Sequence, residues 1–208
     1  MLTIQTLPVY SKEADETEVK LLGLWDKLPQ KPDGSRWRLS QHQVETYKAL
    51  TDSSGPEIVL NTAMTGDGKS LAAYLPVLID ANHHTFGMYP TNELSRDQGR
   101  QFKNYTTQFG QDFPYCSLWG AELTRISEKH NFAYRANALK ERFDNHNVIL
   151  TNPDIFNLVM NYRYRDGIFT SIELPYSLCT NFNNFVLDEF HIFSTPQVTS
   201  VLTAMLYI

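Results

Sequence analysis

The segment from Ala63 to Ser70 reads Ala-Met-Thr-Gly-Asp-Gly-Lys-Ser and has the residue types that hold a phosphate chain. Glycines permit a tight turn whose backbone amides face inward, and a helix that begins after such a turn favours an anion at its N-terminus. The lysine supplies a positive charge for the terminal phosphates, and the serine hydroxyl suits Mg²⁺. An incidental glycine turn is the alternative. The expected nucleotide-binding residues are Thr65, Gly66, Asp67, Gly68, Lys69 and Ser70.

A second group of chemically capable residues follows the apolar run Val186-Leu187, where the sequence continues Asp-Glu-Phe-His. Asp188 suits a magnesium ion, and Glu189 suits the base that orients an attacking water. Two carboxylates after a strand are a weak signal alone. They gain weight because a phosphate-binding segment lies about 120 residues earlier. The expected catalytic residues are Lys69, Asp188, Glu189 and His191, with Ser70 and Asp188 as magnesium ligands.

Short β-branched segments alternate with amphipathic ones along most of the chain, which predicts a mostly parallel sheet with helices on both faces. The expected strands are residues 57–61, 85–89, 114–119, 147–151 and 184–188. The expected helices are residues 40–50, 69–80, 90–109, 152–162 and 198–208, with further helical stretches in 121–145. Ligands bind beyond the carboxyl ends of such strands, where both motifs fall.

The composition of the 208 residues is that of an ordinary folded domain, with 42% apolar and 20% charged residues. Residues 1–35 are richer in charge and in turn residues, so we expect an N-terminal appendage and linker, followed by one domain over 36–208. Two well-separated cysteines, with no leader and no membrane-spanning stretch, favour a cytoplasmic protein that does not contact a membrane. A net charge of −5 argues mildly against nucleic acid, although residues 96–165 carry ten Lys/Arg and seven Asp/Glu.

The sequence Asp-Glu-Phe-His at Asp188–His191 resembles the magnesium motif of the DExH helicases of superfamily 2. The resemblance covers residues 40–193 and implies a RecA-like α/β domain of the P-loop NTPase class that binds ATP and Mg²⁺. It also implies that Gln43 recognises adenine, because amides match the donor–acceptor edge of that base. Gln41 is a rival for this role, and a plain surface glutamine remains the alternative.

Two further segments resemble the strand-contacting motifs of the same helicases, Tyr-Pro-Thr-Asn-Glu-Leu at 89–94 and Leu-Thr-Asn-Pro-Asp at 150–154. In that family such loops hold the backbone of a nucleic acid, and single-stranded DNA is the expected partner. Helix capping is the alternative role for the two threonines. The expected contact residues are Pro90, Thr91, Arg96, Thr151, Asn152, Pro153 and Asp154. Tyr162-Arg163-Tyr164-Arg165 is a further candidate for base stacking, against a solvated helix end.

Within superfamily 2 the sequence looks most like the CRISPR-associated helicase of type I interference, in its nuclease-less type I-D form. The beginning Leu7-Pro8-Val9-Tyr10 and Phe190 of the Asp-Glu-Phe-His motif suggest this form. None of the six histidines precedes an aspartate, so the His-Asp dipeptide of the fused nuclease is missing. The implied partner is a CRISPR surveillance complex or its large nuclease subunit.

Other functions remain open from the sequence: another P-loop ATPase or kinase, an RNA helicase, or an ATPase-deficient docking fragment of a CRISPR complex. The Ser-Ala-Thr coupling motif and the second motor domain of superfamily 2 do not occur among these 208 residues. We therefore expect this chain alone to bind Mg-ATP, to hydrolyse it poorly and to unwind nothing.

Overall fold

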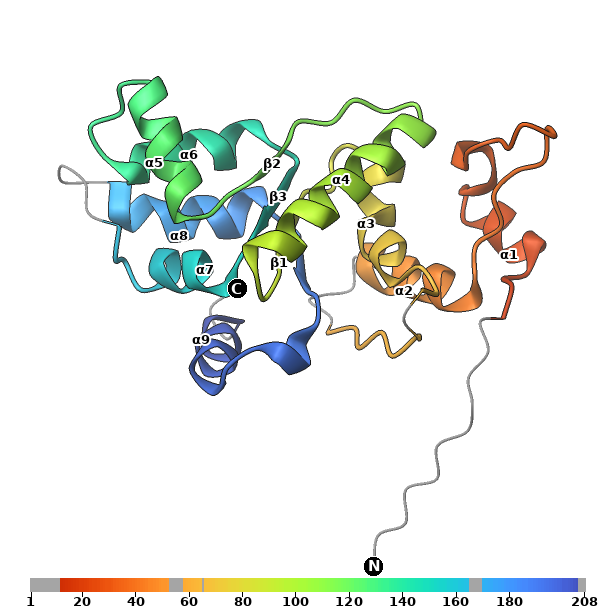
Figure 1. Cartoon of the computed structure of the whole chain (residues 1–208). Helices are drawn as coiled ribbons and strands as arrows, with labels where there is room; N and C mark the ends of the chain where they lie inside the picture. The colour runs from red at the N-terminus through yellow and green to blue at the C-terminus, as the bar shows by residue number, and fades with distance from the viewer. Residues whose placement is uncertain (1–11, 53–57, 65, 165–169, 206–208) are drawn as a thin grey trace, which may run out of the picture. The chain divides into compact units, whose positions relative to one another are not determined.

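The computed structural model describes residues 12–52, 58–64, 66–164 and 170–205 (Figure 1). These residues form two compact units. The first unit runs to Ile79 and includes Gln108–Gly110. The second comprises Asp80–Thr107 and the chain from Gln111 onward.

The first unit contains the short helix α1 (Glu16–Leu21), the 3₁₀ turn η1 (Trp25–Lys27) and the helices α2 (Gln41–Thr51) and α3 (Lys69–Ile79). Helix α1 begins at a capping residue, because the Asp15 carboxylate accepts the N–H of Thr17 at 2.7 Å. Lys48 of α2 forms a 2.9 Å ion pair with Glu18 of α1. The segments on either side of the expected boundary at residue 35 thus contact each other, and that boundary stays a prediction.

The predicted strand at residues 57–61 is wrong for its described part, because residues 58–61 form no strand and pair with no described strand. Ile58 is 78% exposed and Leu60 is 84% exposed. A strand needs a neighbouring strand whose backbone groups complete its hydrogen bonds, and a local run of three apolar residues does not guarantee such a neighbour. The apolar run identified a candidate strand without identifying its partner.

The second unit is built on four parallel strands: β1 (Thr85–Met88), β2 (Tyr115–Ser117), β3 (Val148–Thr151) and β4 (Asn184–Leu187). Their order across the sheet is β2-β3-β1-β4, with β1 paired to β3 on one side and to β4 on the other. Parallel neighbours bring the loops after all four strands to one edge. The sequence predicted each of these strands to within two residues at either end.

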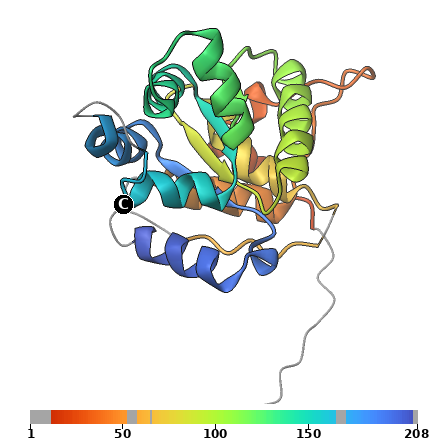
Figure 2. The same cartoon turned by 60° about the vertical axis from the view of Figure 1, so that its left-hand side comes forward.

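Helices cover both faces of this sheet (Figure 2). Helix α4 (Asn92–Gln108) lies on one face, where a Cβ at Gly99 would meet Ser117 Oγ of β2 at 3.1 Å. Glycine therefore permits the close approach of helix and sheet. On the other face the core surrounds Phe86, whose ring packs edge-on against those of Phe143 and Phe182. The predicted α/β class, a RecA-like mostly parallel sheet with helices on both faces, is confirmed.

The helices that contribute to this second core are α5 (Gly120–Lys129), α6 (Arg135–Asn145), α7 (Pro153–Met160), α8 (Thr170–Asn181) and α9 (Thr195–Met205). Helix α8 was not predicted, and it contains Pro175 in its interior. Leu174 and Leu178 of α8 are buried, so tertiary packing offsets the local preference of proline against helix. Among the described helices, none combines the length and the hydrophobicity that a bilayer span requires.

Candidate functional site

The predicted phosphate loop is a tight turn directly before α3. Gly66 has a φ of 92° and Gly68 a φ of 81°, conformations that residues with a side chain rarely adopt. The Asp67 N–H donates to the carbonyl of Met64 at 3.2 Å, and the Asp67 carboxylate accepts the Met64 N–H at 3.2 Å. Thr65 lies outside the described residues. Both glycines are thus required by the backbone of the loop, as the sequence predicted.

Helix α3 begins at Lys69 and places Ser70 in its first turn. The Gly68 carbonyl accepts the helix-type hydrogen bond from Ala72 N at 3.1 Å, while the Gly68 and Lys69 N–H groups donate to no described residue. Lys69 forms no ion pair within the described residues. Among the described residues, two N–H donors without an acceptor, a helix N-terminus and an ammonium group without an ion pair together fit a phosphate chain, and the Ser70 hydroxyl fits its magnesium ion.

The two candidate adenine-recognising glutamines differ in their surroundings. Gln43 is only 6% exposed, and its amide joins two backbone groups: Oε1 accepts Ser40 N at 2.9 Å, and Nε2 donates to Gly68 O at 3.1 Å. The Gln41 amide donates to Glu45 at 3.0 Å. Each atom of the Gln43 amide keeps one further hydrogen-bonding site. Gln43 therefore holds the phosphate loop in this structure, and its recognition of adenine stays a prediction.

The second motif follows β4 at the carboxyl edge of the sheet. Asp188 N donates to the carbonyl of Met88 at 3.1 Å, so the motif begins beside the end of β1. Glu189 adopts a left-handed conformation with φ of 50°, and its N–H donates to Asp188 Oδ1 at 3.0 Å. Its carboxylate lies 3.4 Å from the Nδ1 atom of His191. A glutamate in this conformation costs about 1–2 kcal/mol, which is typical of a functional constraint.

The loops after β1 and β3 are joined at the same edge. Asn152 caps α7 by accepting the N–H of Ile155 at 3.0 Å, and its amide donates to Asn92 Oδ1 at 3.0 Å. Thr91 caps α4 by accepting the N–H of Leu94 at 3.2 Å. The structure thus brings the two expected strand-contacting segments together, each at the beginning of a helix.

Not every residue of these segments is accessible. Thr151 is fully buried, and its hydroxyl donates to the carbonyl of Leu118 at 2.7 Å. A contact between that hydroxyl and the backbone of a nucleic acid does not fit this burial, because a phosphate group cannot reach the hydroxyl. Pro153 is also buried, whereas the exposed Asp154 accepts a hydrogen bond from Gln197 at 3.2 Å. Thr151 instead ties the end of β3 to the residue that follows β2.

The aromatic candidates are placed differently from one another. The guanidinium of the exposed Arg96 lies 4.6 Å from the centre of the Trp119 ring. Tyr164 is 8% exposed, and burial raises its pKa to about 12. Tyr162 is exposed, and Arg165 lies outside the described residues. Stacking of a base on Tyr164 is therefore wrong as an expectation, because its ring belongs to the core.

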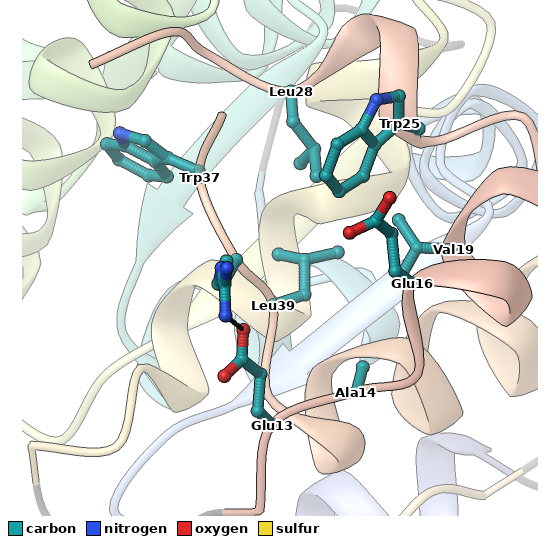
Figure 3. Close-up of a pocket in the computed structure, with 9 residues that line it drawn as sticks. Glu13, Ala14, Glu16, Val19, Trp25, Leu28, Trp37 and Leu39 are labelled. Atoms are coloured by element: carbon teal, nitrogen blue, oxygen red, sulfur yellow. Dashed lines mark hydrogen bonds and ion pairs between the residues drawn. The ribbon is translucent and has the colours of Figure 1, made fainter. Parts of the chain in front are cut away.

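A cavity of about 240 Å³ lies in the first unit, beside the segment that leads into α2 (Figure 3). Its apolar lining includes the buried Leu28 and Leu39 and the half-exposed rings of Trp25 and Trp37. Arg38 and Glu13, which form an ion pair 2.8 Å long, also line it. Leu39, which lines the cavity, directly precedes Ser40, the residue that caps α2. The wall of the cavity therefore leads in sequence into the helix that holds the phosphate loop.

Sequence reasoning missed two residues beside the phosphate loop, His42 and Asn61. They hydrogen-bond to each other and to the backbone of that loop. Their only sequence signal is their position, one in the first turn of α2 and one just before the loop. Lys69 and Ser70 belong to the first unit, whereas Asp188 and Glu189 belong to the second. The structure therefore describes the two halves of the expected nucleotide site separately.

Comparison with solved structures finds helicases. A crystal structure of the DUF1998 helicase MrfA bound to DNA and AMPPNP superposes with a TM-score of 0.57 at 20% identity, covering 88% of this chain and 23% of that one. A second MrfA structure, bound to DNA, gives 0.50 at 16% identity, covering 86% and 26%. A hypothetical ATP-dependent RNA helicase from Sulfolobus tokodaii gives 0.43 at 16% identity, covering 83% and 48%. The chain thus spans about a quarter of the MrfA chains.

No curated protein sequence matches the chain. The family profile described as DEAD/DEAH box helicase matches residues 40–207. This range begins at the residue that caps α2 and includes the phosphate loop, both strand-contacting segments and the Asp-Glu-Phe-His motif. The parallel sheet and the loops at its carboxyl edge agree with that match. The chain belongs to the DEAD/DEAH box helicase family.

Proposed function

We propose that this chain is the ATP-binding motor domain of a helicase or translocase that acts on DNA. The observation that carries the proposal is the loop before α3, where two glycines with positive φ precede a helix that begins at Lys69. Such a loop orients backbone donors and a lysine toward a phosphate chain, and it lies within the segment that matches the helicase family. Hydrolysis of the bound ATP would drive movement along the nucleic acid in the full protein.

The proposed chemical roles follow from residue type and position. Lys69 would neutralise the terminal phosphates, and Ser70 and Asp188 are the residues that would hold Mg²⁺. When bound, the ion neutralises charge that develops on the phosphates during hydrolysis. Glu189 orients the attacking water and accepts its proton. His191 lies close enough to the Glu189 carboxylate to influence its orientation.

The proposed nucleic-acid surface is the carboxyl edge of the sheet in the second unit. The beginnings of α4 and α7 lie there, and a helix N-terminus attracts a backbone phosphate without a formal charge. Pro90, Thr91, Asn152 and Asp154 would line the path of the strand, and Arg96 would add a positive charge. We propose single-stranded DNA as the ligand, and the DNA bound in the MrfA crystal structures favours it over RNA.

We further propose that the full protein acts in CRISPR type I interference in the cytoplasm and is recruited by a surveillance complex or its large nuclease subunit. Support comes from the sequence alone, in the Asp-Glu-Phe-His motif. The supporting segment Leu7–Tyr10 lies outside the described residues. Capture of the chain by such a purified complex, equally for the wild type and for Lys69→Ala, is the expected result. No capture of either protein would reject this role.

Isothermal titration calorimetry with Mg-ATP tests the proposed nucleotide site. The wild-type chain should bind, and Lys69→Met, which keeps the length of the side chain without its charge, should bind at least tenfold more weakly. Replacing the exposed Lys103, which belongs to the second unit, by methionine provides a matched control with the same loss of charge. Equal binding by all three proteins would refute a site at this loop.

A further inference from the structure

Two side chains that none of the proposed catalytic roles uses hold the backbone of the phosphate loop. The Nε2 atom of His42, in the first turn of α2, lies 2.9 Å from the carbonyl oxygen of Asp67. Its Nδ1 atom lies 3.2 Å from the amide nitrogen of Asn61, which precedes the loop. One imidazole ring thus joins the segment before the loop to the centre of the loop.

The hydrogen bonds around Asn61 determine which nitrogen of His42 carries the proton. Asn61 Oδ1 accepts the N–H of Ala63 at 3.1 Å, so its Nδ2 group faces the hydroxyl of the buried Thr46 at 3.2 Å and His42 Nδ1. Because Nδ2 is a donor, His42 Nδ1 must accept. The proton is then on Nε2, which donates to Asp67 O. All of these bonds are satisfied by neutral imidazole in one tautomer.

The same contacts set the direction of the loop's amide protons. The carbonyl and N–H of a trans peptide point in opposite directions, and the described chain contains no cis peptide. The Asp67 carbonyl faces His42, so the Gly68 N–H points away from α2. The Gly68 carbonyl faces Gln43, so the Lys69 N–H also points away. Neither N–H donates to a described residue, so within the described part of the loop no acceptor competes with an anion for them.

We propose that His42 and Asn61 are positioning residues of the nucleotide site, which hold the Asp67 carbonyl toward α2 and thereby direct the Gly68 N–H at a phosphate oxygen before nucleotide binds. The inference rests on the proposed function of the loop. A preoriented donor reduces the entropy lost on binding. Loss of the His42 hydrogen bond should therefore weaken ATP binding about tenfold without contact between His42 and the nucleotide.

Two substitutions of His42 separate positioning from a general effect on folding. His42→Phe keeps a planar ring but removes the N–H donor, whereas His42→Gln can place an amide N–H near the position of Nε2. We expect His42→Phe to raise the Kd for Mg-ATP about tenfold and His42→Gln to stay within about threefold of the wild type. Thermal unfolding should show similar midpoints for the two variants. Wild-type affinity in His42→Phe, or equal losses in both variants, would overturn the inference.

Asn61→Ala is the second variant, because it removes the group that fixes the ring of His42. Combined with His42→Phe it should weaken ATP binding no further than His42→Phe alone, since both changes release the same carbonyl. Additive losses would show that the two residues act independently and would contradict the inference. Lys69→Met serves as the reference for loss of the nucleotide site itself.

The tautomer of His42 is measurable without any nucleotide. Long-range ¹H–¹⁵N spectra of the full chain distinguish Nδ1–H from Nε2–H imidazoles, and the signal that disappears in His42→Gln identifies this residue. A neutral ring protonated only on Nε2 is expected at pH 8. If the wild type bound no ATP while His42 showed this tautomer, the proposed function would fail but the arrangement would stand. Protonation on Nδ1 would overturn the inference whether or not ATP binds.

Discussion

The two glycines of the phosphate loop provide a matched pair of substitutions whose costs differ for a structural reason. Both have positive φ, 92° at Gly66 and 81° at Gly68. A Cβ added at Gly66 would meet no atom within 4 Å, whereas a Cβ added at Gly68 would clash with Gln43 Nε2. Gly66→Ala therefore strains only the backbone, and Gly68→Ala also displaces the glutamine amide.

The magnitudes follow from these contacts. An alanine at positive φ costs about 1–2 kcal/mol, and the smaller entropy of the unfolded alanine chain returns about 0.5–1 kcal/mol, which leaves a net cost of about 1 kcal/mol at either position. Displacing Gln43 breaks its 3.1 Å hydrogen bond to Gly68 O and leaves a buried amide without that partner. That adds about 1–2 kcal/mol. We expect about 1 kcal/mol for Gly66→Ala and about 2–3 kcal/mol for Gly68→Ala.

Urea unfolding followed by tryptophan fluorescence measures the difference. Trp25 and Trp37 lie in the first unit and Trp119 in the second, so a Trp119→Phe background restricts the signal to the unit that contains the loop. Gly68→Ala combined with Gln43→Ala should recover the part of the cost that arises from the clash. Equal destabilisation by Gly66→Ala and Gly68→Ala would refute the role assigned to Gln43.

Three further predictions concern the second unit. Glu189→Asn should raise the free energy of unfolding by about 0.5–1 kcal/mol, because asparagine tolerates the left-handed conformation, and it should abolish ATP hydrolysis by the full protein. Glu189→Gln should abolish hydrolysis without raising the free energy of unfolding. A stability gain in Glu189→Gln would contradict backbone strain at this position. Thr151→Val should lower the free energy of unfolding by about 1–2 kcal/mol through loss of the 2.7 Å bond to Leu118 while leaving the salt dependence of DNA binding unchanged; a change in that slope would restore a backbone contact to Thr151. Desolvation raises the pKa of the half-buried Cys116 to about 12, so at pH 8 this thiol should react with Ellman's reagent much more slowly in the folded protein than in denaturant. Because the folded protein keeps this proton to a higher pH than the unfolded chain, the free energy of unfolding should fall as the pH rises from the unfolded pKa of about 8.5 toward 12. Labelling of the folded protein as fast as in denaturant would contradict the raised pKa.

The parallel sheet was predictable because each of its strands carries a local signal. Segments such as Val148–Leu150 are short, β-branched and flanked by polar residues, and the packing confirms the pattern. Residues 58–61 have a similar local signal and form no strand, since pairing is a property of the partner as well as of the segment. Helix α8 was missed for the converse reason: Pro175 weakens its local preference, and packing of Leu174 and Leu178 restores it.

Within the candidate site, the sequence predicted the backbone conformations of the glycines, but it did not predict the side-chain contacts. The conformations of Gly66 and Gly68 follow from residue type alone. The burial of Thr151 depends on where Leu118 lies, 33 residues earlier, which no local pattern encodes. For the same reason the hydrogen bond from His42 to Asp67 of the phosphate loop, 25 residues away, became visible only in the folded chain.

The most direct test of a nucleic-acid-dependent motor domain is the affinity for Mg-ATP with and without single-stranded DNA, measured by calorimetry. Linkage requires that, if DNA changes the affinity for ATP, ATP changes the affinity for DNA by the same factor. We predict that the wild-type chain binds ATP, that DNA shifts its Kd by about fivefold or more, and that Lys69→Ala abolishes binding in both conditions. ATP binding that depends on Lys69 but is indifferent to DNA would leave a nucleotide site and contradict the motor function. Binding that survives in Lys69→Ala would contradict the nucleotide site itself.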